Sequence, residues 1–341
     1  MKKSCSVILC TVLMLLVFVN LGFAAESKDK KTVYKWRLGT CHTEGPYVDF
    51  ANKFCDYTNK YSNGRMKIKN YSGDLLGDWV HQLESCAVGT QEMAISWPAS
   101  NVNPKLDVTW VPYVFFTWEQ AMQATKPGGW YLKMLEPLYA EAGLYPFAVV
   151  PNQFATVGSN KKIQPYTPDN IKKQNFKLRV PPLMAVKAWA DGIGYNSQTV
   201  PLSEVEIGLK QGMVDGTSCN DHQQIWDCRD LLKYEYLDKE SFIVMVATMN
   251  LKIWKSLSKE DQKIISKAAE MAISDVGTKF SQVDILEKIK RSGKIQVVEI
   301  SNEELRACAK VSREKTWDEI EKKLVGKKLM DIVRANAAPL P

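Results

Sequence analysis

The stretch that decides the fold runs from Phe176 to Cys228 and reads FKLRVPPLMAVKAWADGIGYNSQTVPLSEVEIGLKQGMVDGTSCNDHQQIWDC. Short β-prone runs alternate in it with helical runs, with strands at 176–180, 196–201 and 213–219 and helices at 184–190, after 203 and from 221. Ser203 and Glu206 have the S-x-x-E spacing of a capping box, which predicts the start of a helix. Strands that alternate with helices indicate βαβ units and a parallel sheet.

Polar side chains stand where two of these strands end. In open α/β sheets ligands bind beyond the carboxyl ends of the strands. Arg179 lies at one such end, and Cys219 and Asn220 lie at another. The guanidinium of an arginine is a rigid fork of donors that matches both oxygens of a carboxylate. We therefore predict that Arg179 binds a carboxylate, the alternative being an arginine paired with an acid on the surface of a domain.

The N-terminus has the pattern of a secretory signal peptide. A positive Met1–Lys3 precedes the apolar run Val7–Val19, and small residues at Gly22 and Ala24 fit a cleavage site. An uncleaved anchor is the alternative, but the apolar run is shorter than the roughly 20 residues that span a bilayer. We expect residues 1–24 to be removed by cleavage near Ala24 and the protein to be exported to the periplasm.

The length of the mature chain, about 317 residues, exceeds the size at which one core usually divides in two. A βαβαβ pattern covers 34–97, and an apolar strand at 242–250 is expected to return to this first half. Helical periodicity continues from Ser258 to about Arg291, roughly 50 Å of helix at about 1.5 Å per residue. The predicted fold class is α/β, with two domains that each contain an open, mostly parallel sheet flanked by helices, and a long helix spanning both. Domain I is predicted at 33–150 plus about 243–275, and domain II at 151–242 plus about 276–341.

Composition narrows the function classes. The chain has 45 Lys and Arg against 38 Asp and Glu, and these charges are scattered, so we do not expect nucleic-acid binding. Six cysteines would remain after cleavage, with no C-x-x-C among them. The candidate disulfides are Cys41 with Cys55 or Cys86, and Cys219 with Cys228, but spacing leaves the pairing open.

Catalytic motifs are missing from the sequence. We find no G-x-S-x-G, H-E-x-x-H, P-loop or G-x-G-x-x-G, and the three histidines are isolated. A metal cluster of Cys41, His42, His81 and Cys86 would require two loops to converge. We therefore predict neither an enzyme nor a metal or other cofactor.

Six segments in one order carry a resemblance to a known family. They are YSGDLLGD at 71–78, SNKKI at 159–163, KLRVP at 177–181, PLSEV at 201–205, QGMVDG at 211–216 and WKSLSKEDQK at 254–263. With them the chain resembles the periplasmic solute-binding proteins of TRAP (tripartite ATP-independent periplasmic) transporters, dicarboxylate type. The resemblance implies two domains around a cleft, hinge closure on a small organic acid, and delivery of that acid to membrane permease subunits without chemistry. It also implies that Arg179 clamps the ligand carboxylate, and we expect the protein to act as a monomer.

Three departures from the family pattern bear on the ligand. Ala155 stands where similar proteins carry a second arginine, Cys219 where an asparagine is common, and Trp97 where an acid is common. The hypothesis is a monocarboxylate with an uncharged, aromatic or aliphatic remainder, on which Trp97 could stack; ordinary packing is the alternative for Trp97.

Five further residues complete the candidate ligand set: Gln153, Cys219, Asn220, His42 and Asp78. Two other functions stay open from sequence alone. The first is a binding subunit of a sensory system. The second is a periplasmic enzyme acting on an organic acid, which the missing nucleophile–base pair disfavours.

Overall fold

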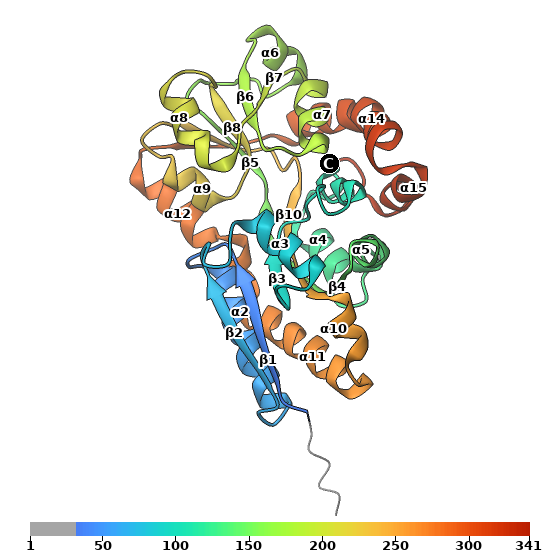
Figure 1. The fold of residues 1–341 in the computed structure, drawn as a ribbon. Coiled ribbons are helices and arrows are strands. Elements are labelled where there is room, and N and C mark those ends of the chain that lie inside the picture. The colour runs from blue at the N-terminus through green and yellow to red at the C-terminus, as the bar shows by residue number, and fades with distance from the viewer. Residues whose placement is uncertain (1–31) are drawn as a thin grey trace, which may run out of the picture. The chain divides into compact units, whose positions relative to one another are not determined.

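The computed structural model describes residues 32–341, of which Tyr34–Pro341 form one unit (Figure 1). The predicted signal peptide therefore lies outside the described residues. Within residues 32–341, no helix combines the length and the apolar composition that a membrane crossing needs. The unit contains two mixed sheets flanked by helices, as the fold class predicted.

The first sheet has five strands in the order β2-β1-β3-β10-β4. Its strands are β1 (Tyr34–Thr40), β2 (Met66–Ser72), β3 (Met93–Ser96), β4 (Leu144–Phe154) and β10 (Phe242–Asn250). The strands β2, β1 and β3 are parallel, and β10 runs antiparallel to β3 and β4. The apolar segment at 242–250 thus does return to the first sheet, as predicted.

The two faces of β10 explain why its sequence is a continuous apolar run. Successive side chains of a strand point to opposite faces of the sheet. Met245, Ala247 and Met249 pack in the cluster under α2 (Pro46–Tyr61) and α11 (Lys259–Val276). Their neighbours Val244 and Val246 pack on the other face, in the cluster that includes α3 (Trp79–Val88) and α5 (Trp130–Glu141). Helices cover both faces of this sheet.

The second sheet has six strands in the order β11-β9-β5-β8-β6-β7. They are β5 (Thr156–Ser159), β6 (Lys177–Val180), β7 (Asn196–Thr199), β8 (Gly216–Asn220), β9 (Tyr234–Leu237) and β11 (Gln296–Glu299). Only β5 is antiparallel to its neighbours. The flanking helices include α6 (Pro168–Lys173), α7 (Met184–Ile193), α8 (Val205–Lys210), α9 (His222–Asp227) and α12 (Val283–Ser292).

The chain passes between the two sheets at three places. It leaves β4 for β5 at Ala155, returns from β9 to β10 through 238–241, and leaves again between α11 and α12. The first two passages are hydrogen-bonded to each other, because the amide of Ala155 donates to the carbonyl of Ser241 at 2.8 Å.

The predicted long helix covers Lys259–Ser292, but it is interrupted. Helix α11 ends at Val276, a 3-10 turn follows at η4 (Gly277–Ser281), and α12 begins at Val283. Gly277 has φ 53° and Gln282 has φ 51°, so both lie in the left-handed region that breaks an α-helix. Helix α11 contacts α2 and β4, whereas α12 contacts α9 and β11, so the two halves serve different sheets.

The predicted capping box at Ser203 is wrong. Ser203 lies inside a 3-10 turn, Leu202–Glu204, which leads into α8 without a side-chain cap. A capping box does form 18 residues later in the chain, where Asp221 and Gln224 cap α9 reciprocally. The remaining elements are η2 (Pro104–Trp110), α4 (Trp118–Thr125), α10 (Leu251–Ser256), α13 (Asn302–Val311), η5 (Ser312–Thr316), α14 (Trp317–Ile320), η6 (Glu321–Val325) and α15 (Lys327–Asn336).

Candidate ligand-binding site

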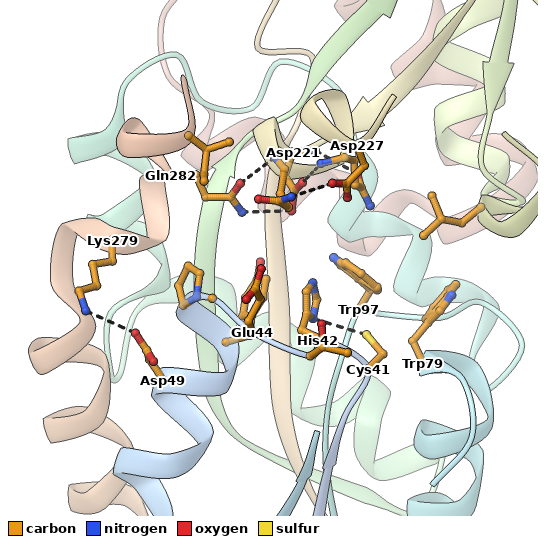
Figure 2. Close-up of a pocket in the computed structure, with 18 of the residues that line it drawn as sticks. Cys41, His42, Glu44, Asp49, Trp79, Trp97, Asp221, Asp227, Lys279 and Gln282 are labelled. Carbon is orange, nitrogen blue, oxygen red and sulfur yellow. Dashed lines mark hydrogen bonds and ion pairs between the residues drawn. The ribbon is translucent and has the colours of Figure 1, made fainter. Parts of the chain in front are cut away.

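A cavity of about 1270 Å³ opens where strands of both sheets end (Figure 2). On the side of the first sheet its walls come from the segments after β1 and β2 and from Trp97, directly after β3. On the side of the second sheet they come from Pro201–Ser203 after β7 and from the segment that follows β8. Residues of η4 and α12 close a further side. The cavity therefore stands at the carboxyl ends of parallel strands, where open α/β sheets bind ligands.

Aromatic rings form the wall on the side of the first sheet. The ring of His42 lies 4.6 Å from that of Tyr47 and 5.1 Å from that of Trp97, between centroids. Trp79 meets Trp97 edge-on at 5.8 Å. Trp79, Trp97 and His42 are half-buried, and Figure 2 shows them side by side below the cavity. Burial lowers the pKa of His42, although Asp221 and Asp74 oppose this shift.

The charged residues of the lining are nearly all acidic. The lining contains seven carboxylates and one lysine, Lys279. The Nζ of Lys279 lies 3.4 Å from the Asp49 carboxylate. The seven are Glu44, Asp49, Asp74, Asp78, Asp221, Asp227 and Asp284. In a chain whose formal net charge is +7, this cavity has the opposite sign.

Asp221 is the buried member of these acids and links three segments. It is 4% exposed, and its Oδ2 accepts hydrogen bonds from Gln282 at 3.1 Å and Asn152 at 3.4 Å. Gln282 also donates to Asn152 at 3.2 Å. Asn152 belongs to β4, Asp221 caps α9, and Gln282 lies between α11 and α12. The network thus joins both sheets beside two of the three passages between them.

Arg179 lies within the second sheet, close to this cavity but not in its lining. Its side chain is 3% exposed, and its Nε donates to the carbonyl of Val200 at 2.8 Å, one residue before the lining begins at Pro201. Among residues 32–341 no carboxylate pairs with its guanidinium. Burial lowers the pKa of Arg179 to about 10, against small opposing effects of Cys219 and Cys228. Arg179 is therefore a buried cation whose charge the described residues leave uncompensated.

The other predicted ligand residues divide into two groups. His42, Asp78 and Trp97 line the cavity, and Asp78 also caps α3 by accepting from the His81 amide at 2.8 Å. Gln153, Cys219 and Asn220 do not line it.

Asn220 is used structurally. Its amide donates to the carbonyls of Thr156 and Thr217 at 3.1 and 2.8 Å and accepts from the Thr217 hydroxyl at 3.1 Å. Gln153 is 3% exposed, donates to the Phe154 carbonyl at 3.2 Å, and has an unpartnered Oε1. Cys219 is half-buried with φ 58°, a conformation rare for a residue with a side chain.

The sequence analysis missed most of the lining, including Tyr47, Trp79, Asp221 and Gln282. Asp221 could have been found, because the D-x-x-Q spacing after a strand is a helix-start signal. Tyr47 and Trp79 begin helices, and their sequence spacing does not distinguish core from cavity. Gln282 lies inside the predicted long helix, where the sequence gives no sign of a break except Gly277.

The cysteines do not form the candidate disulfides. The six within the described residues are all free. The thiol of Cys41 faces His42, with Sγ 3.5 Å from Nδ1, whereas Cys86 lies on the buried face of α3 and its Sγ contacts the Glu92 carbonyl. Burial raises the pKa of Cys41 to about 12, so its thiol stays protonated. Among the same residues no cluster of three His, Cys, Asp or Glu side chains could hold a metal ion.

Comparisons with known proteins agree on one family. Residues 40–323 match the model of the bacterial extracellular solute-binding proteins, family 7. The chain is 24% identical over 269 residues to the C4-dicarboxylate-binding periplasmic protein DctP of Rhodobacter capsulatus, which covers 76% of this chain and 78% of that protein.

Two solved structures have the same fold. The first is a TRAP periplasmic solute-binding protein of Desulfovibrio salexigens with bound orotic acid. The second is the periplasmic ectoine-binding protein of the TeaABC TRAP transporter of Halomonas elongata. The first has a TM-score of 0.79 and 22% identity, covering 89% of this chain and 97% of that one. The second has a TM-score of 0.78 and 21% identity, covering 89% and 98%.

Proposed function

Because the chain belongs to family 7 of the bacterial extracellular solute-binding proteins, which are not enzymes, we propose that it captures a small organic acid and delivers it to the permease subunits of a TRAP transporter. The relatives named above are periplasmic and bind such acids or, in one case, ectoine. The proposed ligand is a monocarboxylate with an aromatic or apolar remainder. The aromatic wall of the cavity supports the second part of this proposal.

The observation that carries the proposal is the uncompensated charge of Arg179. Burying a cation without a partner is costly, so such a group persists where a ligand anion completes it. Arg179 is the penultimate residue of β6, and the segments after the neighbouring strands β7 and β8 line the cavity. A carboxylate entering from the cavity would meet the guanidinium beside Val200.

Closure of two domains is the proposed mechanism. We take the domains to be 33–150 plus about 243–275, and 151–242 plus about 276–341, so that each contains most of one sheet and the first boundary falls within β4, shortly before the passage at Ala155. The passage at Ala155, the passage through 238–241 and η4 would then form the hinge. A ligand that contacts both sides binds the closed state better and shifts the population towards it.

Substitution of Arg179 tests the carboxylate site. We expect Arg179→Ala to weaken carboxylate binding by about 1.5–3 kcal/mol, roughly 10- to 150-fold, because one charge-assisted pair is lost. Isothermal calorimetry with orotate, L-gulonate, pantoate and phenyllactate would measure it. Arg179→Lys should recover part of the affinity, since a lysine supplies charge without the bidentate fork.

The free energy of unfolding of Arg179→Ala, measured without ligand, provides the control. An arginine with a purely structural role would make Arg179→Ala less stable. Removal of an uncompensated buried charge should instead offset the lost hydrogen bond to the Val200 carbonyl, so the free energy of unfolding should change little. Equal carboxylate affinity of the parent and Arg179→Ala would remove Arg179 from the site.

A further inference from the structure

The lining of the cavity has the wrong charge for a ligand that is only an anion. Its seven carboxylates outnumber its single lysine, and that lysine is paired with Asp49. A cleft lined by one sign of charge concentrates ligands of the opposite sign. An organic acid bound at Arg179 would place the rest of its structure in a field that attracts cations.

The aromatic wall is a second and independent feature that suits a cation. Ring faces attract positively charged nitrogen within about 6 Å of the centroid, and several rings together form the cages that hold alkylated ammonium groups. Four rings, those of His42, Tyr47, Trp79 and Trp97, line one wall. Because burial lowers the pKa of His42, its ring stays neutral and does not repel a cation.

A buried group without a partner points to the same place. The hydroxyl of Tyr47 lies near the side chain of Asn152 but makes no well-formed hydrogen bond to a described residue, and Tyr47 is 1% exposed while it lines the cavity. Across from this wall stands Asp221 beside Gln282 (Figure 2). Its carboxylate accepts hydrogen bonds from the side chains of Gln282 and Asn152 and from the Gln224 amide. A space that has aromatic ring faces on one side and an oriented carboxylate on the other is typical of a site that binds an ammonium group.

From this arrangement we infer that the ligand is a zwitterion, with a cationic nitrogen held between the aromatic wall and Asp221. The inference rests on the proposed function, in which Arg179 holds the carboxylate of the same ligand. The sequence predicts that the part of the ligand beyond its carboxylate is uncharged. We now expect that part to be apolar and to carry one positive charge, as in betaines and apolar amino acids. A metal ion does not explain the acidic lining equally well, since no cluster of three ligating side chains occurs within residues 32–341.

Matched pairs of probes that differ only in the cationic nitrogen provide the test. Glycine betaine pairs with 3,3-dimethylbutanoate, L-phenylalanine with 3-phenyllactate, and L-leucine with 2-hydroxyisocaproate. We expect at least one zwitterion to bind with an affinity tenfold or more above that of its partner, as measured by calorimetry on the mature chain. If no zwitterion binds, or if each is bound no better than its anionic partner, the inference is wrong.

A variant then locates the cationic group. Asp221→Asn keeps a good helix cap and removes the charge, so it should weaken the best zwitterion tenfold or more and leave its anionic partner unchanged or tighter. Asp230→Asn is the matched control, because Asp230 is exposed, pairs with Lys294 and does not line the cavity. Equal losses of both probe types in Asp221→Asn would indicate a structural role and contradict the inference.

Failure of the proposed function has a different signature. In that case Arg179→Ala would leave the affinity of every bound carboxylate unchanged, whether or not the probe is zwitterionic. An anion-only ligand that depends on Arg179 would preserve the proposed function and overturn the zwitterion alone.

Discussion

At the scale of single residues, the charges of two arginines, the buried Arg179 and the half-buried Arg65, are handled in opposite ways. Arg179 has no acid beside it among the described residues, whereas Arg65 donates to the carboxylate of Asp261 at 2.6 Å. The Asp261 side chain is 7% exposed and stands in the first turn of α11, which Ser258 caps. One charge is completed by the protein itself, and the other is left for a ligand. This contrast distinguishes a structural ion pair from a binding group.

The structural pair predicts a pH-dependent stability. Burial alone would raise the pKa of Asp261, but the hydrogen bond and charge of Arg65 outweigh it and lower the pKa below its ordinary value. Such a group stabilises the fold fully above its unfolded pKa of about 3.9, and this contribution is lost as pH falls through the lower folded pKa. We expect Asp261→Asn to lower the free energy of unfolding by about 1.5–3 kcal/mol at pH 7. Urea denaturation between pH 7 and 3 should show the difference from the parent shrinking below about pH 4.

An exposed pair serves as the control for this prediction. Glu206 and Lys210 form an ion pair on the surface of α8, with both side chains more than half exposed. Glu206→Gln should change the free energy of unfolding by no more than about 0.5 kcal/mol. A difference between Asp261→Asn and the parent that persists undiminished at pH 3 would contradict the assigned role of the Asp261 charge.

Residue-level prediction of the site was partial for a physical reason. Trp97 was found because it follows β3 directly, and His42 and Asp78 because they lie in the loops after β1 and β2, which can be read from sequence. Asp221 follows β8 directly and was missed although its spacing signals a helix start. Tyr47 was missed because its position in the lining depends on which way a helix start faces. That orientation is fixed by tertiary packing, which hydrophobic periodicity does not describe.

At the scale of elements, the most informative difference lies between α11 and α12. Amphipathic periodicity continues across Gly277–Gln282, so the sequence predicts one helix. The structure turns there because φ is positive at both Gly277 and Gln282. Each half then follows the sheet on which it packs, a requirement of the fold that a one-dimensional pattern does not contain.

This junction predicts a large effect of a small substitution. Gly277 has φ 53° and ψ −126°, a combination that residues with a Cβ rarely adopt. The added methyl group would meet no atom within 4 Å, so the cost arises in the backbone alone. We expect Gly277→Ala to lower the free energy of unfolding by about 1–3 kcal/mol, as measured by urea denaturation.

A second glycine makes the comparison sharp. Gly208 lies inside α8 with ordinary helical φ, and a Cβ there would meet Val214 at 3.5 Å, a normal contact. Gly208→Ala should therefore raise the free energy of unfolding by roughly 0.5–1 kcal/mol. If Gly277→Ala proves as stable as the parent, the left-handed turn is not needed to divide the two helices.

At the scale of the whole molecule, sequence patterns were most successful. Two βαβ patterns predicted two sheets, and the apolar run at 242–250 predicted the strand that returns to the first. What the patterns lacked is the antiparallel direction of β5 and β10 within their sheets. Both are strands that follow a passage between the sheets, so their direction is set by chain connectivity and not by composition.

Closure about these passages is the prediction that belongs to the molecule as a whole. If a ligand bridges both domains, its binding free energy is what shifts the open and closed populations. The radius of gyration from small-angle scattering should then fall as the tightest-binding carboxylate of the calorimetric panel is added. The midpoint of this fall should coincide with the calorimetric dissociation constant, because both report the same equilibrium. Arg179→Ala should move both midpoints together to roughly 10- to 150-fold higher concentration. Binding that saturates while the radius of gyration stays constant would mean that the acid is held without closure, and the hinge assigned to Ala155, 238–241 and η4 would lose its function.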